Sequence, residues 1–145
     1  MSPKDWSFRS MLKALALIGL VLGIWWFGYA ESRAVLRNDL KLIELPKSVH
    51  AVSCTSGFTT DVLTDCDFEV DSFDFELLLK GRKYYPPSQG VVGSQTSGWS
   101  GNAPFVVTQT YKAQTDGNPE FPHGGSFYIY VNSDRTKGRT FLYIE

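Results

Sequence analysis

The apolar stretch Leu12–Ala30 constrains this chain most. It reads LKALALIGLVLGIWWFGYA, with one charge, Lys13, and no further charge before Glu31. About 19 residues of α-helix rise roughly 28 Å, close to the hydrocarbon thickness of a bilayer. Near its end stand three aromatic residues of the kind that favours the headgroup region: Trp25, Trp26 and Phe27. The stretch predicts a transmembrane helix, with those three rings as its anchor at the membrane surface.

A cleavable signal peptide would have similar parts: a basic start, an apolar run, and small residues at Gly28 and Ala30. Bulky aromatic residues beside the potential cleavage site oppose cleavage. The helical pattern also continues past Ala30, because apolar residues recur at spacings of four and three: Leu36, Leu40 and Ile43. We therefore expect an uncleaved signal-anchor over residues 12–30, and a juxtamembrane helix that continues to about Glu44, before Pro46.

Basic residues follow the span at a spacing of four: Arg33, Arg37 and Lys41. Such a stripe can contact anionic lipid headgroups, and the alternative is an ordinary solvated helix face. Basic residues flank the span equally on both sides, so their count does not orient it. The short segment 1–11 instead predicts a cytoplasmic N-terminus in a bacterial inner membrane, with a periplasmic C-terminal domain.

The composition of the remaining chain limits its partners. Residues 31–145 are enough for one domain, which we place at 46–145, and they carry 11 basic and 14 acidic side chains. This balance disfavours nucleic acid. No asparagine begins an Asn-x-Ser/Thr acceptor, which favours a bacterial envelope over a eukaryotic secretory route.

The alternation of residues predicts two paired strands, 49–56 and 62–70. With a turn centred on Thr60, Cys54 faces Cys66, and His50 faces Val70. Both cysteines then lie on the core side, and we expect a disulfide between them, with Cα atoms about 4.4–6.8 Å apart. Two buried free thiols are the alternative.

The opposite face of the second strand carries acidic residues: Asp65, Asp67 and Glu69. They belong to a set of seven acids between Asp61 and Glu76 that contains no Lys or Arg. Clean alternation predicts that this face is exposed to solvent. It is either a plain soluble surface or a docking face for a basic protein partner.

The rest of the chain completes an α+β domain of order β-β-α-β-β-β, an antiparallel sheet with one packed helix. The helix is expected at 72–80 and the later strands at 104–113, 127–131 and 140–145. Between them, residues 84–103 form an irregular segment with three aromatic residues, Tyr84, Tyr85 and Trp99. Long connections of this kind are often functional. We include Trp99 among the expected partner-binding residues.

Three segments carry a family resemblance. They are LP-S-V at 45–49 leading to Cys54, GFTTDVLTDCDFEV at 57–70 leading to the 74–81 segment, and FPHGG at 121–125 before LYIE at 142–145. These segments resemble a family of small, uncharacterised, single-span envelope proteins of Gram-negative bacteria. The resemblance implies location and fold, but no activity.

Catalytic chemistry is weakly represented. The only histidines, His50 and His123, are far apart in sequence, and no metal site, cofactor or enzyme activity is expected. We expect a membrane-tethered interaction domain that binds another protein, as a toxin inhibitor or immunity protein or an envelope assembly subunit. The alternative is a glycan-binding module, for example for peptidoglycan, that stacks sugars on the aromatic residues of 84–103.

Overall fold

The computed structural model describes residues 8–58, 61–89, 97–98 and 101–145. The chain forms two compact units, Met1–Glu31 and Ser32–Glu145. Trp99 lies outside the described residues. Trp25, Trp26 and Phe27 lie within a described helix, but their side chains are outside the description.

Helix α1, Phe8–Asp39, provides the described part of the first unit and the start of the second. Within the described residues, one helix is long and apolar enough to cross a membrane, over Lys13–Asp39. Its apolar side chains are exposed, including Leu17 at 66 % and Leu20 at 62 %. A helix of the predicted kind is therefore present.

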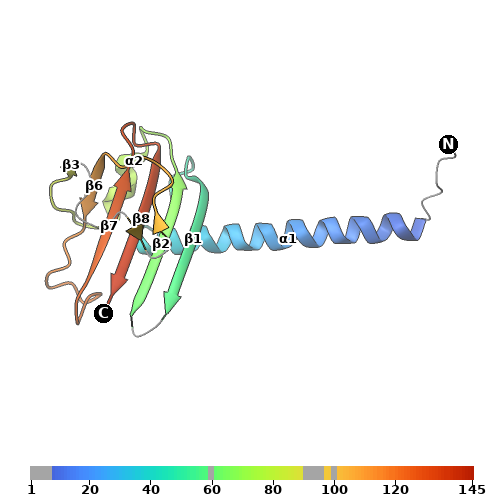
Figure 1. The fold of residues 1–145 in the computed structure, drawn as a ribbon, viewed down its shortest axis with the longest axis horizontal. Coiled ribbons are helices and arrows are strands. Elements are labelled where there is room, and N and C mark those ends of the chain that lie inside the picture. The colour runs from blue at the N-terminus through green and yellow to red at the C-terminus, as the bar shows by residue number, and fades with distance from the viewer. Residues whose placement is uncertain (1–7, 59–60, 90–96, 99–100) are drawn as a thin grey trace. The chain divides into compact units, whose positions relative to one another are not determined.

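The second unit is built on a six-stranded antiparallel sheet in the order β1-β2-β8-β7-β6-β3 (Figure 1). The strands are β1 (His50–Phe58), β2 (Val62–Glu69), β3 (Ser88–Gln89), β6 (Gln109–Lys112), β7 (Gly125–Val131) and β8 (Lys137–Ile144). A separate small hairpin joins β4 (Ser97–Gly98) to β5 (Gly101–Asn102). Helix α2 (Phe75–Leu78) continues into a 3-10 turn, η1 (Leu79–Gly81). The domain is therefore α+β, as predicted, with three short strands that the sequence did not indicate.

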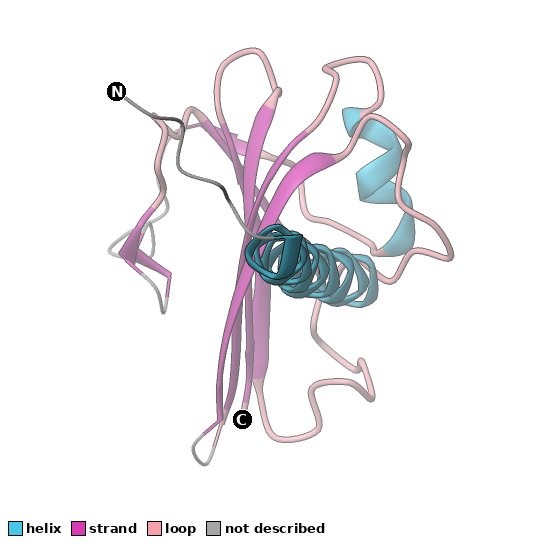
Figure 2. Cartoon of the chain, turned by 90° about the vertical axis from the view of Figure 1, so that its right-hand side faces the viewer, coloured by secondary structure: helices cyan, strands magenta, loops and turns pink. Residues whose placement is uncertain are grey.

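The two faces of the sheet are covered differently. Helix α2 lies against one face, and the β4–β5 hairpin lies over the other (Figure 2). The core on the α2 side includes side chains that are completely buried: Leu36, Leu40, Phe75, Leu78, Phe127 and Ile129. The last turns of α1 are therefore part of the domain core rather than a linker to it.

Helix α1 ends earlier than the expected Glu44. The amide of Leu42 donates to the oxygen of Arg37 over 3.1 Å, and Lys41 adopts a positive φ of 57°. This is the hydrogen-bond pattern of a Schellman stop, which usually places glycine at the position that Lys41 occupies. Ile43, predicted to lie on one helix face with Leu36 and Leu40, is consequently 99 % exposed, whereas Leu36 and Leu40 are buried.

The predicted disulfide is present between β1 and β2. Cys54 is paired in register with Cys66, and their Cα atoms are 4.1 Å apart, slightly closer than the expected range. The pairing of His50 was predicted incorrectly: it lies opposite Glu69, not Val70. An irregularity between His50 and Ser53, where Ala51 has a φ of 49°, shifts the register by one residue.

The α2 segment is shorter than predicted. Residues 72–74 form a turn instead of a helical start, and Asp74 makes no side-chain cap bond. The Asp74 carboxylate instead accepts a 2.6 Å hydrogen bond from the Ser48 hydroxyl. The burial pattern follows from this shift, because Phe75 and Leu78 are buried whereas Phe73 is exposed.

Candidate binding groove between residues 41–47 and α2

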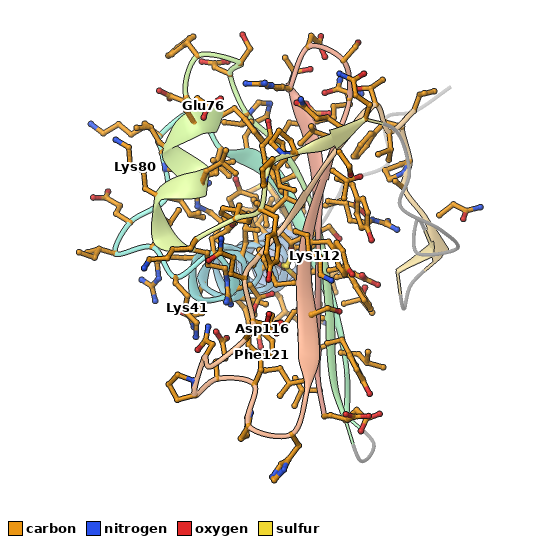
Figure 3. The ribbon with its side chains drawn as sticks, turned by 90° about the vertical axis from the view of Figure 1, so that its left-hand side faces the viewer. Lys41, Glu76, Lys80, Lys112, Asp116 and Phe121 are labelled. Carbon is orange, nitrogen blue, oxygen red and sulfur yellow. A yellow bond between two sulfur atoms is a disulfide. The ribbon has the colours of Figure 1, made fainter. Side chains whose placement is uncertain are left out.

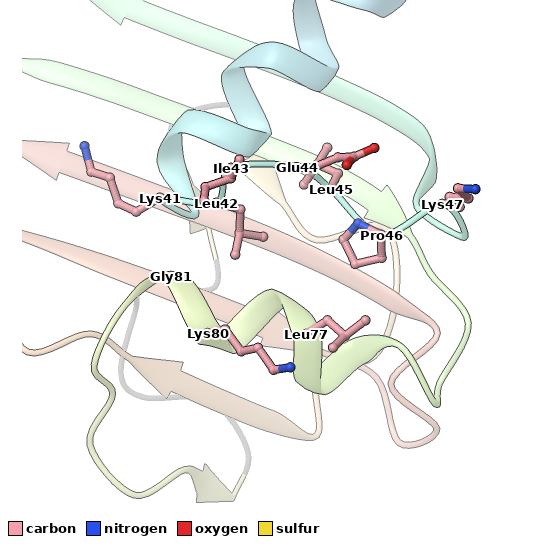
Figure 4. Close-up of a pocket in the computed structure, with 10 residues that line it drawn as sticks. All are labelled: Lys41, Leu42, Ile43, Glu44, Leu45, Pro46, Lys47, Leu77, Lys80 and Gly81. Atoms are coloured by element: carbon pink, nitrogen blue, oxygen red, sulfur yellow. The ribbon is translucent and has the colours of Figure 1, made fainter.

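An open groove of about 540 Å³ lies where the segment after α1 passes α2. Its lining is contributed by residues 41–47 on one side and by Leu77, Lys80 and Gly81 on the other. Leu42 projects from the first wall toward α2, and Leu77 projects from α2 toward Pro46 (Figure 4). The volume lies within the range of small-molecule and peptide-anchor sites.

The groove contains exposed apolar side chains that nothing in the described domain covers. Ile43 is 99 % exposed and Leu77 is 37 % exposed. The premature end of α1 produces this arrangement, because it turns Ile43 away from the core face that Leu40 occupies. Single exposed leucines are ordinary, but a hollow lined by several apolar residues is typical of a contact surface.

Basic side chains line this groove: Lys41, Lys47 and Lys80. Lys41 forms a 3.0 Å ion pair with Glu120. Lys47 and Lys80 form no ion pair with any other residue in the described part of the chain. The groove also contains one acid, Glu44. The groove lining therefore carries a net positive charge, whereas the domain as a whole is negatively charged.

A buried ion-pair cluster lies next to Lys41 and Gly81 of the groove. Arg82, whose side chain is 4 % exposed, donates to both carboxylate oxygens of Glu120, over 2.7 and 3.0 Å. Its Nε also donates to the main-chain oxygen of Asp39, over 2.6 Å. Burial tends to raise the pKa of Glu120, but hydrogen bonds from Arg82 and Lys41 hold it below its usual value.

Asp39 is the unusual member of this cluster. It is 8 % exposed, and its Oδ2 has no hydrogen-bond partner among the described residues. Burial raises its pKa to about 7, assisted by the nearby Glu120 and opposed by Arg82 and Lys41. The carboxyl is thus positioned to change charge near neutral pH.

The three basic residues predicted to contact lipid headgroups have different partners in the structure. Arg33 donates to the main-chain oxygen of Val49, and Lys41 is paired with Glu120. Arg37 is exposed and donates to Asn38 over 3.3 Å. Arg33 and Lys41 are therefore held by contacts within the domain, so the three do not form one free stripe.

The expected solvent exposure of the acidic strand face is wrong for Asp65, which is 2 % exposed. Asp67 receives two hydrogen bonds from the buried Arg139, over 2.7 and 2.6 Å. Glu69 lies 3.3 Å from His50 and 3.6 Å from Lys137. The β4–β5 hairpin contacts this face, since Arg139 also donates to the main-chain oxygen of Gly101 in β5. The three acids are thus largely engaged within the domain.

Tyr84 and Tyr85, two of the aromatic residues of 84–103, lie in different environments. Tyr84 packs edge-to-face on Tyr111 with ring centroids 6.3 Å apart, and its hydroxyl is buried. Tyr85 is 39 % exposed and donates to Asp116 over 3.2 Å. Trp99 lies outside the described residues, so it cannot be placed beside them.

Metal ligands do not gather in the described ranges: no group of three or more His, Cys, Asp or Glu side chains there could hold an ion. His50 is exposed and contacts Glu69, and His123 is exposed in the connection before β7.

No family model matches the chain, and no similar protein was found among curated proteins or among solved structures. The resemblance to small envelope proteins thus stays a prediction. Sequence reasoning missed the groove because its main signal, Ile43, fits the helical period of the buried face.

Proposed function

We propose that this chain is a membrane-anchored interaction domain that binds another protein through the groove between residues 41–47 and α2. The observation that carries the proposal is a groove whose lining combines lysines with the almost fully exposed Ile43. Apolar contact in such a hollow supplies affinity, and the surrounding charge selects the partner.

The partner's chemistry follows from the lining of the groove. Lys47 and Lys80 would attract carboxylates, and Ile43, Leu42 and Leu77 would take apolar side chains. The fitting ligand is an amphipathic segment with an apolar stripe bordered by Asp or Glu, which is a common mode of recognition. This partner is acidic, in contrast to the basic one expected from Asp65, Asp67 and Glu69.

The proposal includes a periplasmic location. The N-terminus would be cytoplasmic, residues 12–30 of α1 would span a bacterial inner membrane, and the domain would lie outside. The Cys54–Cys66 disulfide supports an oxidising compartment, and the length of α1 supports the anchor. The proposed role is binding rather than catalysis, either as an inhibitor or immunity protein or as an assembly subunit.

Site-specific photocrosslinking in intact bacteria tests the groove. A photoreactive residue in place of Ile43 should form protein adducts, and one in place of the exposed His123 should not. Mass spectrometry of the adduct should identify an acidic amphipathic segment, which should also bind the purified full chain as a synthetic peptide. Adducts with phospholipid alone, or none, would overturn the proposal.

A charge reversal provides the matched control. Lys47→Glu together with Lys80→Glu should abolish crosslinking from position 43, because the acidic edge of the partner would then be repelled. Lys83→Glu, which changes a nearby exposed lysine outside the groove lining, should leave it intact. Equal loss in both variants would exclude selection by the groove.

The location requires its own test. An alkaline phosphatase fused after Glu145 should be active in cells, because that enzyme needs an extracytoplasmic site to form its disulfides. A cytoplasmic reporter at the same position should be inactive. The reverse result would place the domain in the cytoplasm.

A further inference from the structure

A second hollow lies beside β3 and β6 at one edge of the sheet, apart from the residues that line the groove. It encloses about 300 Å³ and is lined by Tyr85, Pro86, Ser88, Thr110, Lys112, Thr115 and Asp116. Lys112 and Asp116 can be followed in Figure 3, which also labels Lys80 of the groove, in η1. The volume is at the lower end of small-ligand sites, enough for one ring and its substituents.

Two prolines interrupt the strand pairing beside the hollow. The chain before β3 runs antiparallel to β6: Tyr85 donates its amide to Lys112 over 2.9 Å, and Ser88 pairs with Thr110. Pro86 and Pro87 have no amide hydrogen, so the ladder is interrupted between these contacts. The two chain segments are therefore hydrogen-bonded at Tyr85 and paired at Ser88, but not between these residues.

The side chains in the hollow combine an aromatic ring with hydrogen-bonding groups. Tyr85 is 39 % exposed, and its hydroxyl donates to the Asp116 carboxylate over 3.2 Å. Lys112 is exposed, with its Nζ 5.8 Å from the Tyr128 ring centroid. The lining thus combines one aromatic ring with an amine, a carboxylate and hydroxyls, which together offer apolar and polar contacts to one small ligand.

We infer that this hollow binds a pyranose ring of a glycan. One face of a sugar ring is apolar and suits the Tyr85 ring, while its equatorial hydroxyls can both donate to Asp116 and accept from Lys112. Opposite charges on Lys112 and Asp116 select against strongly charged ligands and favour a neutral sugar. The inference does not rest on the proposed protein-binding groove, with which the hollow shares no lining residue.

The test uses the full chain in nanodiscs, titrated with chitotetraose and cellotetraose by calorimetry. We expect binding of at least one probe with a Kd of about 1 mM or tighter. Tyr85→Ala should weaken it about tenfold or more, since the stacking surface is lost. Tyr85→Phe should stay within about threefold, because the ring remains.

His123→Ala is the control outside the hollow and should bind like the wild type. Lys47→Glu/Lys80→Glu should also bind normally, which separates this site from the groove. No binding of either sugar at about 10 mM overturns the inference, and so does unchanged affinity in a folded Tyr85→Ala variant. Circular dichroism establishes that each variant is folded.

Discussion

Arg82 donates from Nε to the main-chain oxygen of Asp39 over 2.6 Å, and thereby joins the end of α1 to the segment after α2. A cation at a helix C-terminus also interacts favourably with the helix dipole. Because Glu120 holds the same guanidinium, one buried arginine connects three parts of the chain. The geometry of the neighbouring groove depends on this connection.

Gly81 is the tightest point of this connection. A Cβ at Gly81 would lie 2.0 Å from the oxygen of Leu40 and 2.7 Å from that of Lys41, so the backbone would have to move. We expect Gly81→Ala to destabilise the domain by about 1–3 kcal/mol, measured by thermal unfolding of the full chain in detergent. Lys80→Ala, an exposed neighbour, should change stability by less than about 0.5 kcal/mol. Equal stability of the two variants would contradict the close contact.

Asp39 predicts a pH dependence of stability. Its pKa is about 7 in the folded chain, against 3.8 for the ordinary group, chiefly because of burial. Between these values the unfolded chain loses a proton that the folded chain keeps, so stability falls as pH rises from about 4 to about 7 and then levels off.

Asp39→Asn should remove this dependence, because an amide does not ionise. The unfolding free energy of the variant, relative to that of the wild type, should rise by about 2–4 kcal/mol between pH 4 and pH 8, measured by unfolding across that range. The exposed Asp71→Asn serves as the control and should follow the wild type. Parallel curves for Asp39→Asn and the wild type would show that Asp39 titrates normally.

The sequence could predict those features that follow from local pattern. The apolar run gave α1, and alternation in β2 placed Cys66 opposite Cys54 on the core side. Two backbone features could not be predicted: the end of α1 at Lys41 and the register shift at Ala51. Both residues adopt positive φ angles, which usually indicate glycine. The end of α1 and the register of His50 were therefore missed together.

The acidic face was misread for a different reason. Alternation in β2 distinguishes two faces of a strand, but cannot show that both are covered. Asp65 is 2 % exposed, and the residue near it that also contacts β5 is Arg139 of β8, which is distant in sequence. The groove also depends on a tertiary contact, since α2 meets residues 41–47 only in the folded chain.

The disulfide should contribute measurably to stability. Cys54 and Cys66 are separated by 12 residues, and closing such a loop is worth about 3 kcal/mol in the chain-entropy description. Replacing both by Ala should lower the unfolding free energy by about that amount. A reductant should destabilise the wild type and leave the double variant unaffected. Mass spectrometry of protein alkylated in intact cells should find neither cysteine modified, and two alkylated cysteines would show that the bond does not form there.

Arg139 and Asp67 should show strong energetic coupling. The Arg139 side chain is 5 % exposed, and the hydrogen bonds from it to Asp67, with the nearby Asp65, raise its pKa despite burial. Arg139→Met would leave the carboxylates of this buried cluster without their cation, and should destabilise the domain by about 3 kcal/mol.

The double variant Asp67→Asn/Arg139→Met isolates the pair. If the two side chains act on each other, the double variant should lose about 1–3 kcal/mol less stability than the sum of the two single variants. Glu76→Gln/Arg135→Met, which removes a more exposed 2.6 Å ion pair, is the matched control and should show less than about 1 kcal/mol of coupling. Additive losses at Asp67 and Arg139 would contradict this coupling, and would leave the Asp67 carboxylate available to a basic partner.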